Sequence, residues 1–96
     1  MFTPEMLKDA VDVYRENEYW KGYYDTAPSE ECQFRIALGW AYSMFHPVES
    51  AEMKKMREKA EESLKLQDWE HLCKYAGNNP WRGLCRQRIR ELGGKV

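Results

Sequence analysis

The stretch that decides the fold is residues 29–47, SEECQFRIALGWAYSMFHP. Its residues 36–45 include one polar side chain, Ser43, and a helix that is apolar on all sides is a buried helix. His46 precedes Pro47 and ends the helix, because the residue before a proline avoids the α region. This stretch therefore predicts a helix at the centre of the core.

The central helix has a clear start and one unusual position. Ser29 suits the N-cap, so the helix is expected over about residues 29–45. Gly39 lies in its middle, where glycine costs about 1 kcal/mol relative to alanine. We expect Gly39 to permit the close approach of a neighbouring helix.

A first helix is expected to begin at Thr3, with Pro4 at its first position, and to run to about residue 21. Gly22 then ends it. Its apolar face has helical spacing and consists of Leu7, Ala10, Val11 and Tyr14.

Helical spacing recurs in three later segments, at about 48–66, 68–76 and 80–92. Asp68 and Asn79 are the expected N-caps of the last two. Their expected ends are Gly77 and Gly93-Gly94. The expected inward-facing residues are Met53, Met56, Ala60, Leu64, Trp69, Leu72, Cys73, Ala76, Trp81, Leu84, Cys85, Ile89 and Leu92. The charged residues of the first segment, Arg57 and Glu61 included, are expected to form a solvated face.

No segment shows the alternating pattern of a strand. The sequence therefore predicts an all-α, compact single domain over residues 1–96, bundle-like and with about four to five helices.

Composition limits the class of protein. The 15 basic and 16 acidic residues give a net charge of −1, which indicates no general polyanion binding. The longest apolar run is too short to cross a bilayer, and the N-terminus lacks the basic region of a signal peptide. The three cysteines form no paired pattern, so they are interpreted as reduced thiols of a cytoplasmic protein.

Motifs of catalysis and metal binding are not found. The chain has no glycine-rich phosphate loop, HExxH, GxSxG or CxxC motif. His71 and Cys73 lie on different sides of a helix and do not converge on one ion. We expect no catalytic residue, no metal and no cofactor, and therefore a protein that is not an enzyme.

Two short segments are similar to known helical motifs. Leu38-Gly39-x-x-Tyr42, followed by Ala51, resembles part of the tetratricopeptide consensus, which implies a helix hairpin used for peptide binding. Later consensus positions hold other residues in this chain. The last two helices resemble a helix-turn-helix, although Gly83 and Arg86 occupy its apolar positions. Neither likeness assigns a family.

Two candidate contact surfaces remain. The first is aromatic and consists of Tyr19, Trp20, Tyr23 and Tyr24, residue types that contribute most to protein interfaces. The second is basic and consists of Lys74, Arg82, Arg86, Arg88 and Arg90, with Arg82, Arg86 and Arg90 at helical spacing. Structural readings stay open for both: the aromatic residues could edge the core, and the arginines could form a solvated face.

These features favour a small intracellular, non-catalytic interaction protein that docks on a protein partner, as adaptors, accessory subunits and phage or mobile-element inhibitors do. The alternative is a nucleic-acid-binding module that uses the basic C-terminal helix. No membrane partner is expected, and self-association is another use of the aromatic surface.

Overall fold

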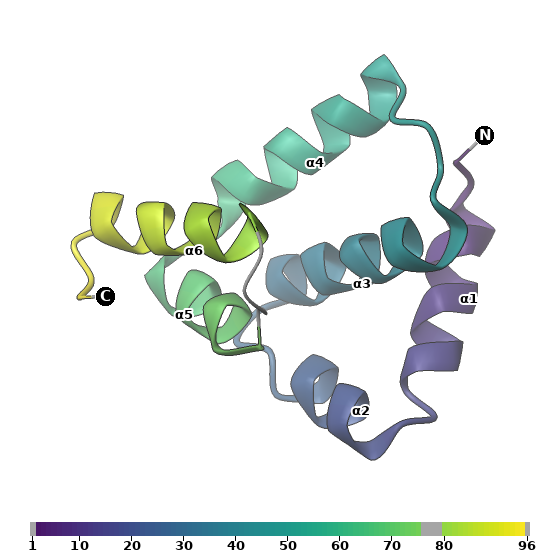
Figure 1. Ribbon diagram of the computed structural model, residues 1–96, viewed down its shortest axis with the longest axis horizontal. Helices are drawn as coiled ribbons and strands as arrows, with labels where there is room; N and C mark the ends of the chain where they lie inside the picture. Colours follow the sequence, from purple (N-terminus) through teal and green to yellow (C-terminus); the bar gives the residue numbers. More distant parts are fainter. Residues whose placement is uncertain (1, 76–79, 96) are drawn as a thin grey trace.

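The computed structural model describes residues 2–75 and 80–95. Six helices follow one another in this part of the chain, and no strand is found in it (Figure 1). The helices are α1 (Pro4–Tyr14), α2 (Glu18–Asp25), α3 (Glu30–Phe45), α4 (Ala51–Ser63), α5 (Leu66–Tyr75) and α6 (Pro80–Glu91). The all-α prediction is confirmed, and the expected number of helices is too low.

Helix α3 is the central element, as the sequence predicts. It contacts α1, α2, α4 and α5. The axes of these helices point in different directions and do not form a parallel bundle (Figure 1). The Cα radius of gyration is 13.1 Å, close to the roughly 12.5 Å expected of a compact chain of this length. The described helices include none with both the length and the apolar character that a bilayer crossing requires.

The caps of α3 are those the sequence indicates. Ser29 accepts a hydrogen bond from the amide of Cys32 through its Oγ. At the other end, His46 adopts a left-handed conformation with φ 48°, directly before Pro47.

The expected first helix is divided in two, which is the main correction to the sequence analysis. Asn17 begins α2, and its side-chain oxygen accepts hydrogen bonds from the amides of Tyr19 and Trp20. A continuous helix would carry the polar residues at 17, 18 and 21 along the apolar face of α1. The break instead turns Trp20 toward the core, and Gly22 lies inside α2 rather than at a helix end.

Asp68 connects two helix starts. Its Oδ1 accepts a hydrogen bond from the Ser29 hydroxyl, and its Oδ2 accepts one from the amide of Lys65. Helix α5 therefore begins at Leu66, and Asp68 lies in its first turn rather than at the expected N-cap. The Asp68 side chain is 1% exposed, so this shared cap is part of the core.

Helix α6 ends at the glycine pair, as expected. Gly93 has φ 86°, its amide donates to the Arg90 carbonyl, and the Gly94 amide donates to the Ile89 carbonyl. This pair of bonds is the Schellman arrangement. Leu92 is 47% exposed, against the expectation that it faces inward. The expected caps Gly77 and Asn79, and the inward position of Ala76, lie outside the described residues.

The main core forms around α3 and α5. Its largest fully buried side chains are Trp69 and Leu72, and Leu38 of α3 is fully buried outside this cluster. Helix α4 contributes Met53 and Ala60 to the buried set, and Leu64 directly after the helix is also buried, whereas Met56 stays 40% exposed.

Candidate functional site

The aromatic residues gather around Trp40 of α3, which is 6% exposed. Tyr14 and Tyr24 stack on its ring, with centroid separations of 4.8 Å and 5.5 Å. Trp20 and Tyr23 meet it edge-on at 6.4 Å and 6.5 Å. Each such pair stabilises the fold by about 0.5–1.5 kcal/mol in addition to the contribution of its buried apolar area. The main role of this set is therefore structural: it holds α1 and α2 against α3.

The four residues of the expected aromatic surface are therefore distributed over core and surface. Tyr23 is buried at 7% exposure and belongs to the core. Trp20 and Tyr24 are half-buried, and they line different cavities. Tyr19 is 57% exposed. The structure thus does not bring the four together as one open surface, and their role in binding stays a prediction.

A buried ion pair connects α3 and α4. The Nε of Arg35 donates to Oε1 of Glu61 across 3.3 Å, and the two side chains are 10% and 6% exposed. The expected solvated position of Glu61 is therefore wrong: this residue turns inward because Arg35 lies beneath α4. Burial lowers the pKa of the Arg35 guanidinium, and the Glu61 carboxylate raises it again.

Arg57 extends this pair toward the surface. Its Nη1 lies 3.5 Å from Oε2 of Glu61, and its Nε and Nη2 donate to Glu49. The hydroxyl of Tyr42 also donates to Glu49. The hydrogen bonds from Arg57 and Tyr42 lower the pKa of the Glu49 carboxyl. Glu61 is thus shared between two arginines, and the network leads from the core to solvent.

Arg35 also lies against an aromatic ring. Its guanidinium carbon is 4.1 Å from the ring centroid of Trp81, at the start of α6. This cation–π contact stabilises a guanidinium that is largely removed from water. Trp81 in turn packs on Trp69, with a centroid separation of 5.8 Å.

Two cavities meet at Arg35, and we call them together the Arg35 cleft. One has a volume of about 240 Å³ and is lined by residues that include Trp20, Trp40 and Ser43. The other has a volume of about 400 Å³ and is lined by residues that include Tyr42 and Arg57. Arg35, Gly39 and Trp81 line both.

Gly39 shapes the cleft in a way the sequence analysis did not anticipate. A Cβ at this position would lie 3.3 Å from Nη1 of Arg35, and no neighbouring helix backbone is near it. The missing side chain therefore makes room for the guanidinium rather than for another helix. The spacing of four residues places Arg35 and Gly39 on the same face of α3.

The Arg35 guanidinium is only partly used by the protein. Its Nε has an acceptor, whereas Nη1 and Nη2 make no hydrogen bond to any residue that the structure describes. The sequence analysis missed Arg35 as a site residue. A signal was present: it is a cation directly before the apolar run of α3, one helical turn from a mid-helix glycine.

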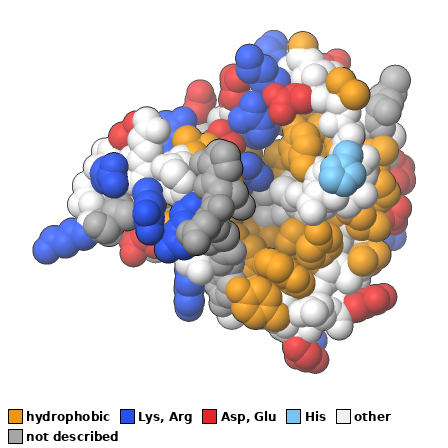
Figure 2. Space-filling view, viewed as in Figure 1, with side chains coloured by type: hydrophobic (Ala, Val, Ile, Leu, Met, Phe, Trp, Pro, Cys, Tyr) orange, Lys and Arg blue, Asp and Glu red, His pale blue; other side chains and the backbone are white. Residues whose placement is uncertain are grey.

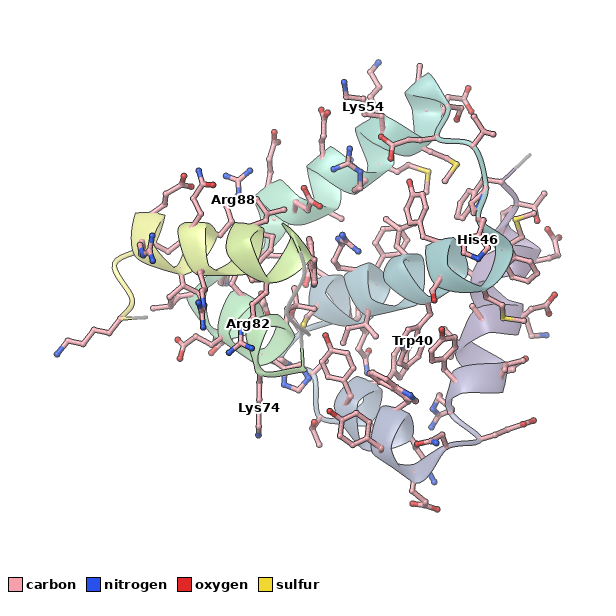
Figure 3. All side chains as sticks on the ribbon, viewed as in Figure 1. Trp40, His46, Lys54, Lys74, Arg82 and Arg88 are labelled. Atoms are coloured by element: carbon pink, nitrogen blue, oxygen red, sulfur yellow. The ribbon has the colours of Figure 1, made fainter. Side chains whose placement is uncertain are left out.

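The expected basic surface is not continuous. Arg86 and Arg90 are exposed, Arg82 and Arg88 are half-buried, and Lys74 lies on α5. Arg82 and Arg88 point to opposite sides of α6 (Figure 3). Arg88 pairs with Glu91 at 3.3 Å, while Arg86 and Arg90 form no ion pair within the described residues.

On one face of the molecule, the two kinds of side chain occupy different sides. Figure 2 shows hydrophobic side chains gathered at the lower right, over α1, α2 and α3, and basic side chains at the left, over α6. This separation keeps the aromatic and basic candidates apart as two surfaces.

The thiols have structural environments. Cys32 and Cys85 are fully buried, and burial raises the pKa of each thiol to about 12. Cys73 is half-buried. Over residues 2–75 and 80–95, His, Cys, Asp and Glu form no group suited to a metal ion. His71 instead stacks on Tyr23, with its Nε2 2.7 Å from the Tyr23 carbonyl oxygen.

Comparison with protein-family models, with curated proteins and with solved structures found no match to the chain. The Arg35 cleft and the exposed arginines of α6 are the features of the molecule that bear on its function.

Proposed function

We propose that this is a small, non-catalytic, cytoplasmic interaction protein that docks on a protein partner through the Arg35 cleft. The observation that carries the proposal is a buried arginine, with two terminal nitrogens unused by the described residues, in a cleft with tryptophan walls. Arginine, tryptophan and tyrosine are the residue types enriched in interface hot spots.

The acidic groups of the cleft support binding rather than catalysis. Glu49 and Glu61 both accept hydrogen bonds from arginines, and Arg57 bonds to both. The Glu49 pKa is lowered by these bonds, whereas a general acid or base works best with a pKa near the operating pH. We therefore assign the two carboxylates to holding Arg35 and Arg57 in place.

Selection of short random displayed peptides on the purified protein tests this proposal. Ser43 is exposed, accepts a hydrogen bond from the Tyr14 hydroxyl and lines the tryptophan side of the cleft, so Ser43→Lys would place a long cationic side chain at the cleft. Ser63→Lys is the matched control, because Ser63 is exposed at the end of α4 and lines a different cavity. Circular dichroism of both variants checks the fold.

We expect the selected peptides to bind the wild type and Ser63→Lys. We expect them not to bind Ser43→Lys. Selection of no peptide, or equal binding to both variants, would contradict docking through the cleft. Sedimentation of the wild type and Ser43→Lys separates the other use of this surface: a dimer that only the wild type forms would show self-association.

The second candidate is nucleic-acid binding through α6, and the exposure of Arg86 and Arg90 favours it. Two phosphate contacts on duplex DNA give a log–log salt slope of about −1.8, or about a 12-fold loss of affinity between roughly 50 and 200 mM salt. Arg86→Glu should then abolish binding, whereas Lys59→Glu, the same charge change on exposed α4, should not. Equal binding by both variants would assign the arginines to a solvated face.

A further inference from the structure

Arg35 has hydrogen-bond donors that the described residues do not use. A guanidinium has five N–H donors, of which the protein uses the one on Nε. The side chain is 10% exposed, so bulk water reaches it only through the cleft that it lines. Nη1 and Nη2 are not fully closed off from solvent, so a ligand acceptor that enters the cleft would take the place of the solvent that meets them.

The charges around Arg35 disfavour a polyanion in the cleft. Arg35 and Arg57 share Glu61, so the inner part of the network has one cation more than it has anions. Glu49, whose side chain is 33% exposed, balances this excess from the solvent side. The four groups together are neutral, so a single carboxylate at Arg35 adds one negative charge, whereas a polyanion adds more and also faces the carboxylates of Glu49 and Glu61.

The geometry of the guanidinium suits a carboxylate. Two parallel N–H···O bonds join the terminal nitrogens of arginine to both oxygens of one carboxylate. Trp81 covers a face of the Arg35 guanidinium, and Glu61 occupies its Nε edge. The Nη1 and Nη2 edge is the part left for a ligand.

The walls beside this edge suit an aromatic side chain. The cavity that contains Trp20 and Trp40 has a volume of about 240 Å³, which is room for about eight waters at liquid density. Aromatic rings pack edge-on or offset against such walls, as Trp20 and Trp40 already do with each other at 6.4 Å.

We infer that the Arg35 cleft recognises a carboxylate next to an aromatic side chain in a segment of the partner protein. The carboxylate accepts hydrogen bonds from Nη1 and Nη2 of Arg35, and the aromatic side chain packs against the tryptophan walls. This inference rests on the proposed function, because it names the chemistry of the partner at the same cleft.

A pair of small probes that differ only in their charge tests the inference. N-acetylphenylalanine has a free carboxylate beside an aromatic ring, and N-acetylphenylalaninamide has the same ring without the charge. Each is titrated into ¹⁵N-labelled protein, and the arginine Nε–H signals are followed by NMR. Arg35→Lys identifies the Arg35 signal, and it keeps the charge while removing the paired terminal nitrogens.

We expect the carboxylate probe to shift the Arg35 signal and to bind about tenfold more tightly than the amide. Binding should be lost in Arg35→Lys. Equal affinity for the two probes, or no shift at Arg35, would overturn the inference. A tighter response to uridine 5′-monophosphate than to N-acetylphenylalanine would also overturn it and indicate a nucleotide site.

Peptide selection separates this inference from the proposed function. Selected peptides that need the cleft but lack an acidic residue or a bound terminal carboxylate would leave docking intact and overturn carboxylate recognition. If the carboxylate probe binds at Arg35 but no peptide is selected, the conclusion is reversed. Carboxylate recognition by the cleft would then stand, and docking on a protein partner would be overturned.

Discussion

Replacing Glu61 by glutamine should destabilise the protein much more than its place among the charged residues of α4 suggests. The substitution keeps the shape of the side chain and removes its charge from a pair that is 10% and 6% exposed. Removing one partner of a buried pair costs about 3–5 kcal/mol, because the other charge stays buried. The contact with Trp81 and the access of solvent at the cleft offset part of this cost, so we expect about 3 kcal/mol.

This loss is measurable by urea unfolding, followed by circular dichroism and tryptophan fluorescence. Domains of this size have a free energy of unfolding of about 5–14 kcal/mol, so the variant should still fold at room temperature. Its melting temperature should fall by about 12–24 °C, since 1 kcal/mol corresponds to about 4–8 °C.

Glu58→Gln is the matched control, because Glu58 lies on the same helix in an exposed pair with Lys54 at 3.9 Å. Exposed pairs contribute about 0–1 kcal/mol. The double variant Arg35→Met/Glu61→Leu should recover most of the loss, since replacing both partners of a buried pair is often neutral. A loss at Glu61→Gln as small as that at Glu58→Gln would refute the buried pair.

Three further predictions concern the glycines and the thiols. Gly83→Ala should raise the free energy of unfolding by up to about 1 kcal/mol, because this helical site has open space around it. Gly94→Ala should lower the free energy of unfolding by about 1–3 kcal/mol, because the new Cβ would overlap neighbouring side chains. Urea midpoints in the reverse order would contradict this prediction. Cys73 should react with a thiol reagent faster than Cys32 or Cys85 in the folded protein, and equal rates would be inconsistent with the burial of the latter two. The raised pKa of Cys32 and Cys85 keeps both protonated in the folded state while the unfolded thiols ionise. The contribution of the two thiols to the free energy of unfolding should therefore be fully present below about pH 8.5. It should be lost as pH rises toward 12, by up to about 2.7 kcal/mol per pH unit for the two thiols together. A urea midpoint unchanged between about pH 8 and 10 would contradict this prediction.

The central helix could be predicted because its signals are local. Ser29 and His46-Pro47 mark the ends of α3, and the apolar run between them leaves no solvent-facing side. The break before Asn17 could not be predicted in the same way. It depends on where Trp20 packs, and the ring that Trp20 packs on belongs to α3.

The candidate site was missed for a similar reason. Glu61 lies among charged residues that are mostly solvated, and only its distance of 3.3 Å from Arg35 separates it from them. That partner is 26 residues away in the chain, beyond any helical spacing. The aromatic residues were recognised as a group, but a sequence pattern does not show that Trp40 organises them or that Tyr23 is buried.

The central claim is that Arg35 is held by Glu61 inside the protein while its terminal nitrogens face a cleft. The most direct measurement is the arginine Nε–H spectrum of the ¹⁵N-labelled protein, recorded with and without N-acetylphenylalanine. We predict one signal that is protected from exchange with water, disappears in Arg35→Lys and shifts with the carboxylate probe but not with its amide. Fast exchange of every arginine Nε–H, with no signal that moves on addition of the probe, would contradict the claim.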